Sequence, residues 1–250
     1  MTAAGRPRVS RLRMFAGPNG SGKTTISNIV EHDNEIWLGI KVNPDDIEAD
    51  VRRTGLFDFD DFEITVTDDQ LRNFLGLSKQ RLREAQLVRT AAKLRVHNNR
   101  ISFRNLSINS YFAALLADLV RQQLLLTGKS FSFETVMSHR KKIEFLSEAR
   151  KAGYRNYLYF ITTKDPVINI SRVKARVKTG GHPVPPGKIK TRYVRVMDSL
   201  LDAIKVSDRA YIYDNSGNET VIIAEFHGGK LTLHVDEVPQ WFDKYVLKKL

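Results

Sequence analysis

The sequence predicts an α/β fold in which a mainly parallel sheet lies between layers of helices. Three observations lead to this prediction. Short apolar runs alternate along the chain with helical patterns of apolar residues. A glycine-rich loop, "GPNGSGKT" at 17–24, follows the first apolar run. Near the C-terminus, a two-glycine turn at 228–229 joins two alternating runs, which predicts a hairpin.

The composition narrows the class of protein. The 250 residues are enough for one α/β domain covering 1–250. Forty Lys and Arg against 28 Asp and Glu give a net charge of +12, which favours a phosphate-rich substrate or partner, or an acidic protein. The absence of cysteine excludes disulfides, thiolate metal sites and cysteine nucleophiles. No apolar run reaches the roughly 18 residues of a membrane span and no signal-peptide pattern is present, so we expect a soluble, cytoplasmic protein.

The glycine-rich loop matches the phosphate-loop pattern G-x-x-x-x-G-K-[ST]. It stands between a predicted strand, 11–16, and a predicted helix, 24–32, as a P-loop NTPase requires. Glycines let backbone N–H groups converge on phosphates at a helix N-terminus. We expect Lys23 to reach the β and γ phosphates and Thr24 to ligate Mg²⁺. The predicted ATP-binding residues are Gly17, Pro18, Asn19, Gly20, Ser21, Gly22, Lys23, Thr24 and Thr25.

A second candidate segment follows the first helix. The mostly apolar run 35–42 predicts a buried strand, and "NPDD" after it predicts a turn. Residues just past the carboxyl end of a strand line the ligand crevice of an open α/β sheet. We therefore expect Asn43, Asp45 and Asp46 near the phosphates. Asp45 has a simpler alternative role as a turn-forming residue.

Residues 51–128 are predicted to form a helical insertion. The segment begins acidic, becomes basic and helical between 79 and 104, and ends in an amphipathic helix at 110–128. Two interpretations of the basic stretch remain open. It is either a solvated helix face or a surface that binds a phosphorylated substrate or a partner.

The next strand is predicted from the alternation of Phe and Ser at 130–133, with Glu134 and Thr135 at its end. A helix with an apolar face follows and ends near Gly153. The run 154–163 is predicted to be another strand. Glu134 is a candidate for substrate contact, or alternatively a helix-capping or surface acid.

A lid is predicted over 172–195. Asp165 and Pro166 have the residue types of an N-cap and a first helical position. The helix that they begin leads into the breaker-rich loop 180–188, and a helix over 189–208 returns from it. The arginines around the loop could close over phosphates, or each could form a structural salt bridge. They are Arg172, Arg176, Arg192 and Arg195.

The C-terminal part completes the predicted sheet. The run 209–217, "RAYIYDNSG", is expected to be its last parallel strand. Residues 218–250 are predicted to form the hairpin and a short terminal helix.

Five stretches together resemble the zeta-toxin family of P-loop kinases: "AGPNGSGKTT", "VNPDDI", "FSFETVMS", "RVKARVKTGGHPVPPGKIKTRY" and "YDNSG". They occur in the family's order over residues 11–217. The resemblance implies a fold like that of nucleoside monophosphate kinases, with an arginine lid. It also implies ATP-dependent phosphorylation of a hydroxyl on a nucleotide-linked substrate, because characterised zeta toxins phosphorylate UDP-N-acetylglucosamine and a related bacterial effector phosphorylates NAD. Zeta toxins are paired with an antitoxin protein that blocks the nucleotide site.

The resemblance also implies roles for single residues. Asp45 matches the aspartate that accepts the proton of the substrate hydroxyl, and Asp46 is the alternative if the register of the match slips by one residue. Lys23, Arg176 and Arg192 are the implied cations around the transferred phosphate. In the better-known toxins a second arginine lies within the lid loop, where this chain has Gly181 and His182, so Arg192 is expected to replace it. The substrate-binding residues are expected to be Asn43, Asp46, Glu134, Thr135, Arg172 and His182.

Two other function classes stay open at this point. The net charge suits a nucleic-acid-binding NTPase or a polynucleotide kinase, although no RNP-like or base-stacking motif is present. Alternatively, the chain is a nucleotide-regulated binding module of a toxin–antitoxin pair.

Overall fold

The computed structural model describes residues 9–32, 35–106 and 108–250. The chain divides into two compact units. The first unit contains residues up to 39 and from 132 to 250, and the second contains 40–131. None of the described helices is long and apolar enough to cross a membrane.

A central sheet organises the first unit. Its strands are β1 (Arg11–Ala16), β6 (Phe131–Thr135), β7 (Arg155–Thr162), β8 (Arg209–Asp214), β9 (Val221–His227) and β10 (Lys230–Leu233). They lie in the order β10-β9-β8-β7-β1-β6. β1, β7 and β8 are parallel neighbours, whereas β9 and β10 form the predicted antiparallel hairpin at one edge.

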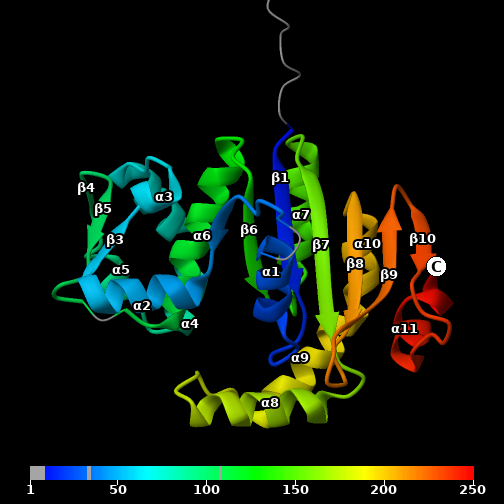
Figure 1. Ribbon diagram of the computed structural model, residues 1–250. Helices are drawn as coiled ribbons and strands as arrows, with labels where there is room; N and C mark the ends of the chain where they lie inside the picture. The colour runs from blue at the N-terminus through cyan, green and yellow to red at the C-terminus, as the bar shows by residue number, and fades with distance from the viewer. Residues whose placement is uncertain (1–8, 33–34, 107) are drawn as a thin grey trace, which may run out of the picture. The chain divides into compact units, whose positions relative to one another are not determined.

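Helices surround this sheet, on both of its faces and beyond the ends of its strands (Figure 1). They are α1 (Lys23–His32), α7 (Lys141–Lys151), α8 (Pro166–Lys178), α9 (Pro186–Asp198), α10 (Leu200–Lys205) and α11 (Gln240–Tyr245). Figure 1 shows α7 and α10 on the far side of the sheet and α1 on the opposite face. The buried residues of β1 and β7 are apolar or aromatic except for Arg13, Asn156 and Thr162, as expected for inner parallel strands that are covered on both faces. The predicted arrangement of a mainly parallel sheet between helices is therefore confirmed.

The core between α1 and the sheet is partly aromatic. Ile26 and Val30 of α1 pack with Phe15, Tyr159 and Ile161. The rings of Phe15 and Tyr159 stack with centroids 4.6 Å apart, and Tyr159 stacks on Tyr211 at 5.0 Å. Offset stacking of this kind adds to the burial of apolar area. This packing fixes the start of α1, and hence the loop before it, against β1 and β7.

The second unit has its own sheet and helices. Its elements are β2 (Ile40–Val42), α2 (Pro44–Thr54), β3 (Leu56–Asp58), the 3₁₀ turn η1 (Asp60–Phe62), α3 (Asp68–Leu77), α4 (Lys79–Glu84), α5 (Val88–Ala91), β4 (Val96–His97), β5 (Arg100–Ser102) and α6 (Ser110–Leu126). The small sheet has the order β3-β5-β4. The unit begins and ends close together, because the Ile40 N–H donates to the Ser130 carbonyl at 3.0 Å.

Three predicted elements differ from the structure. The strand predicted over 35–42 is limited to β2, because Glu35 and Gly39 have positive φ values and Leu38 instead joins the core around α1. The basic stretch 79–104 is not continuously helical. Asn98 and Asn99 both adopt the left-handed conformation that a tight hairpin turn requires, so β4 and β5 form there. The helix predicted over 189–208 starts earlier, at Pro186, and is interrupted at Ser199.

Candidate active site

The predicted phosphate loop connects β1 to α1, at residues 17–22. Gly17, Gly20 and Gly22 have φ values of +152°, +76° and +95°, which side-chain-bearing residues rarely adopt. A Cβ on Gly17 would lie 1.9 Å from the Ile161 carbonyl oxygen of β7. The Gly17 N–H also donates to the Thr135 carbonyl at 3.2 Å. The loop is thus held between the ends of β6 and β7.

Lys23 folds back over the loop. Its ammonium group donates to the carbonyl oxygens of Gly17 at 3.1 Å and Pro18 at 3.0 Å. This brings a positive charge to the mouth of the loop, beside the N-terminus of α1. A helix N-terminus carries a partial positive charge, so both groups favour an anion at this place.

Thr24 is tied to the end of β6. Its hydroxyl donates a hydrogen bond to Glu134 Oε2 at 3.0 Å. Within the described part of the chain, no group of three or more His, Asp or Glu side chains could hold a metal ion by itself.

Thr135 has a structural task in addition to any contact with substrate. Its hydroxyl accepts a hydrogen bond from the Met137 N–H at 3.2 Å, and Met137 has a positive φ of 56°. Its carbonyl holds Gly17. The structure therefore brings Glu134 and Thr135 to the loop, as expected for residues at the end of a neighbouring strand.

Helices α8 and α9, which correspond to the predicted lid, carry the predicted arginines. Arg192 of α9 donates to the side-chain oxygen of Asn19 at 3.3 Å and so lies against the loop. Arg176, near the end of α8, donates to the His182 carbonyl at 3.2 Å. A Cβ on Gly181 would lie 2.6 Å from Arg176 Cγ, so a glycine is needed for this close contact. The structure thus brings Arg192 to the phosphate loop, whereas Arg176 and His182 contact each other within the lid.

Arg172 lies on α8 but points to another loop. Its guanidinium donates to the carbonyls of Asn215 at 2.7 Å and Gly217 at 3.2 Å. These carbonyls belong to the turn after β8. In the structure Arg172 therefore holds the "DNSG" turn. Asn215 of this turn contacts the phosphate loop in its own right.

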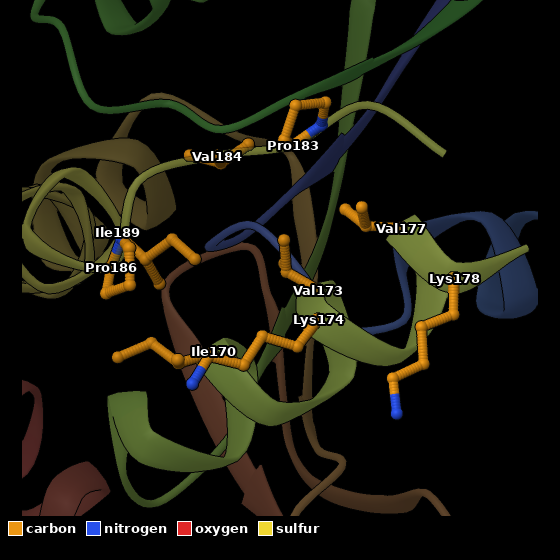
Figure 2. A pocket seen from close by; sticks show the side chains of 9 residues that line it. All are labelled: Ile170, Val173, Lys174, Val177, Lys178, Pro183, Val184, Pro186 and Ile189. Carbon is orange, nitrogen blue, oxygen red and sulfur yellow. The ribbon is translucent and has the colours of Figure 1, made fainter. Parts of the chain in front are cut away.

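A pocket of about 350 Å³ lies between α8, the loop 179–185 and α9. Figure 2 shows side chains from α8 and the lid loop converging on it. Val173 also lies next to the phosphate loop, because a Cβ on Gly20 would be 3.1 Å from Val173 Cγ2. The lining residues are Ile170, Val173, Lys174, Val177, Lys178, Pro183, Val184, Pro186 and Ile189.

The remaining predicted residues belong to the second unit. Asn43 is the N-cap of α2, and its side chain accepts a hydrogen bond from the Asp45 N–H at 3.0 Å. Asp45 and Asp46 form the first turn of α2, where negative charge interacts favourably with the helix dipole. Partial burial raises the pKa of the Asp46 carboxyl, although its hydrogen bond with Asn43 acts in the opposite direction.

Two functional candidates were missed by sequence reasoning. Asn169 of α8 donates to the Asn19 carbonyl at 2.9 Å, and Asn215 donates to the Ser21 carbonyl at 2.8 Å. The "YDNSG" stretch was a signal for Asn215. Asn169 had none, because its partner lies 150 residues away in the chain.

The chain shares its fold with solved structures. The crystal structure of AvrRxo1-ORF1:AvrRxo1-ORF2 with sulphate ions aligns with a TM-score of 0.53 at 15% identity, covering 93% of this chain and 65% of that chain. The structure of the same pair with ATP aligns with a TM-score of 0.52, also at 15% identity, over 90% and 61%. An uncharacterised protein of Haemophilus influenzae is 35% identical over 63 residues, which are 25% of this chain and 45% of that protein. The chain thus spans less than two thirds of each of these proteins.

A model of the family described as Zeta toxin matches residues 89–225, more than half of the 250 residues. The match contains Glu134, both predicted lid helices and the "YDNSG" stretch. The match begins after the phosphate loop. In the structure this loop lies beside the matched residues, because the Gly17 N–H donates to the Thr135 carbonyl. The chain belongs to the zeta toxin family.

Proposed function

We propose that the protein is an ATP-dependent kinase that transfers the γ-phosphate to a hydroxyl of a small nucleotide-linked substrate, such as a UDP-N-acetylglucosamine-like sugar or a dinucleotide. Membership of the zeta toxin family and the P-loop kinase fold support this proposal. The observation that carries it is the set of groups around one loop. Lys23, the Thr24–Glu134 pair and Arg192 all contact residues 17–24 or belong to them.

The loop residues fit a nucleoside triphosphate. Lys23 would exchange the carbonyls of Gly17 and Pro18 for oxygens of the β and γ phosphates, which are stronger partners for an ammonium group. The N–H groups of the loop and of the first turn of α1 would bind the same phosphates. A crystal structure of AvrRxo1-ORF1:-ORF2 with ATP exists for the same fold.

The site also fits Mg²⁺ as the second cofactor. The Thr24 hydroxyl uses its proton in the hydrogen bond to Glu134, so its lone pairs are free to face a cation. Hydroxyl and carboxylate oxygens are ligands that Mg²⁺ prefers. When bound, the ion would neutralise charge on the β and γ phosphates. Glu134 therefore orients the Thr24 hydroxyl for the metal.

The transfer step requires a new bond between the substrate hydroxyl oxygen and the γ-phosphorus, while the bond from phosphorus to the β–γ bridging oxygen breaks and ADP leaves. The hydroxyl proton goes to the carboxylate of Asp45, in the first turn of α2. Lys23, Arg192 and Arg176 balance the charge that spreads over the transferred group. For Arg176 this requires release of the His182 carbonyl.

The acceptor site is proposed to include Asn43, Asp46, Glu134, Thr135, Arg172 and His182. For Arg172 the contribution is indirect, because its guanidinium holds the turn after β8. For His182 it depends on the lid loop, to which Arg176 binds.

A protein partner of antitoxin type is part of the proposal. The two AvrRxo1-ORF1 structures are complexes with a second protein, AvrRxo1-ORF2. A nucleic-acid partner has less support than an antitoxin-like protein, because several arginines of the basic stretch bind other groups of the second unit. Arg81 and Arg100 of its basic stretch form ion pairs with Asp118 and Asp58, and Arg95 donates to the carbonyls of Ala92 and Leu94.

The direct test uses ATP labelled at the γ-phosphate. The protein is incubated with this ATP, Mg²⁺ and a bacterial metabolite extract, and labelled products are identified by mass spectrometry. We expect one labelled metabolite that carries a nucleotide and a new phosphate ester. A label found only in inorganic phosphate, or only in nucleic acid, would contradict the proposal.

A further inference from the structure

We propose that Asn169 and Asn215 are positioning residues that turn two N–H groups of the phosphate loop toward the bound phosphates. The inference rests on the proposed binding of ATP. It goes beyond it by naming the side chains that shape the loop from behind, and neither residue belongs to the predicted nucleotide contacts.

Each asparagine holds one carbonyl of the loop. Asn169 Nδ2 donates to the Asn19 carbonyl at 2.9 Å, and Asn215 Nδ2 donates to the Ser21 carbonyl at 2.8 Å. The described residues contain no cis peptide bond. In a trans peptide the carbonyl and the N–H of the same plane point in opposite directions. An outward carbonyl of residue 19 or 21 therefore requires an N–H of Gly20 or Gly22 that points into the loop.

The two glycines make these contacts possible. A Cβ on Gly20 would lie 2.7 Å from the Asn169 carbonyl oxygen. A Cβ on Gly22 would lie 2.3 Å from Asn215 Nδ2. Any larger residue would displace the asparagine as well as strain the backbone. The glycines of this loop thus allow the backbone of Asn169 and the side-chain amide of Asn215 to approach closely, in addition to adopting positive φ values.

Both amides are fixed in orientation. Asn169 is completely buried, and its Oδ1 accepts a hydrogen bond from the Thr163 hydroxyl at 2.5 Å. The Oδ1 of Asn215 accepts from the Thr220 hydroxyl at 3.0 Å. With the oxygen of each amide engaged, its NH₂ group is left to face the loop.

The backbone of Asn215 is also held on both sides. Its N–H donates to the Thr162 carbonyl at 2.8 Å, and its carbonyl accepts from Arg172. Asn169 and Arg172 both lie on α8, the first of the two predicted lid helices. The direction of the loop N–H groups is therefore linked to the seating of α8 on the carboxyl ends of β7 and β8.

The test replaces the donating NH₂ group of each asparagine by an oxygen, in a side chain of nearly the same shape. In Asn215→Asp and Asn169→Asp, an ionised carboxylate would face a carbonyl oxygen and repel it, so the peptide plane rotates. We expect the Kd for ATP and ADP, measured by calorimetry on the full chain, to rise at least about tenfold, since hydrogen bonds to charged groups contribute about 1.5–3 kcal/mol. The Kd for adenosine should not change.

Protonation separates positioning from damage to the fold. A protonated carboxyl regains one donor, so the ATP affinity of both Asp variants should recover as the pH falls through the pKa of the new carboxyl. Asn215→Ala and Asn169→Ala lack a donor at every pH and should show no recovery.

Asn156→Asp is the matched control. Asn156 is also completely buried, and its Nδ2 donates to the carbonyls of Leu146 at 2.6 Å and Val206 at 3.2 Å, both outside the phosphate loop. This variant should lose thermal stability while its ATP affinity at 25 °C stays that of the wild type.

The possible outcomes are distinct. If the wild type binds ATP and the Asp and Ala variants bind it equally well, the positioning role is overturned and the kinase proposal stands. If the wild type itself binds no ATP, the proposed function fails, and this inference fails with it. Equal losses for ATP and adenosine would also overturn the inference, because they would indicate a general loss of the fold.

Discussion

The hydroxyl of Thr24 donates to the carboxylate of Glu134 at 3.0 Å, across 110 residues of sequence. This contact joins the first turn of α1 to the end of β6. It places an acidic side chain beside the residue that ends the phosphate-loop motif. The pair gives the loop a carboxylate whose charge is opposite to that of Lys23.

Glu134→Gln tests this pair. The amide keeps the shape of the side chain but removes its charge and weakens the hydrogen bond from Thr24. We expect the Mg²⁺ concentration for half-maximal phosphoryl transfer to rise about tenfold, while binding of ATP without Mg²⁺ is unchanged. A Mg²⁺ titration of activity measures the shift. Glu144→Gln, on the exposed face of α7, is the control and should behave as the wild type.

Asp45→Asn tests the acceptor of the hydroxyl proton. An amide cannot take up the proton, so we expect the transfer rate to fall by about 10²- to 10⁴-fold with unchanged ATP affinity. Single-turnover transfer and calorimetry give the two quantities. Asp46→Asn, one residue further along α2, is the matched variant. Normal transfer by Asp45→Asn would exclude the role, and a loss confined to Asp46→Asn would move it to Asp46.

Arg176→Ala tests the charge held in the lid. Because Arg176 binds the His182 carbonyl in the structure, it contributes little to the initial binding of ATP. We expect kcat to fall by about 10²- to 10³-fold with little change in the Kd for ATP. Arg150→Ala removes another exposed arginine that donates to a carbonyl, that of Lys205, and should retain full activity. A loss of ATP affinity equal to the loss of kcat would contradict this role.

How far the site could be predicted depended on the number of residues that separate its contacting side chains in the sequence. The loop, the N-cap Asp165 and the C-terminal hairpin follow from neighbouring residues, and the structure confirms them. The hairpin at Asn98–Asn99 was missed because the charged residues around it suggested a helix, although two consecutive asparagines were a local turn signal.

Other parts of the site depend on contacts that no local pattern encodes. Asn169 and Asn215 reach the loop across 150 and 194 residues. Leu38 leaves the predicted strand because the core around Val30 and Phe15 offers it complete burial. For the arginines, their positions around the loop 180–188 predicted a common lid but not the group that each guanidinium contacts. The separate tasks of Arg172, Arg176 and Arg192 are visible only in the structure.

A buried tyrosine of α9 predicts how stability depends on pH. Tyr193 is buried, its hydroxyl donates to the Thr163 carbonyl at 2.6 Å, and burial raises its pKa to about 12 from 10.0. The folded protein therefore keeps a proton that the unfolded chain loses above pH 10. The stabilisation is complete below pH 10 and is lost as the pH rises toward 12, by up to about 2–3 kcal/mol.

Urea unfolding between pH 8 and pH 12 measures this dependence. Tyr193→Phe should be less stable than the wild type at pH 8, since a hydrogen bond is lost, but its stability should fall less steeply above pH 10. Tyr111→Phe removes an exposed tyrosine and should retain the wild-type slope. An identical slope in Tyr193→Phe would contradict the assignment.

The hydrogen bond between the Ile40 N–H and the Ser130 carbonyl has a consequence for how such proteins diversify. Residues 40–131 leave and rejoin the rest of the chain through ends that touch each other. A segment with adjoining ends can be lengthened, shortened or replaced at little cost in chain entropy to the remainder, because the closure between its ends is already made. The proposed proton acceptor, Asp45, travels with that segment, whereas the phosphate loop does not. Exchange of the one stretch of gene that encodes residues 40–131 could therefore change the molecule that receives the phosphate, while the loop proposed to bind ATP stays the same.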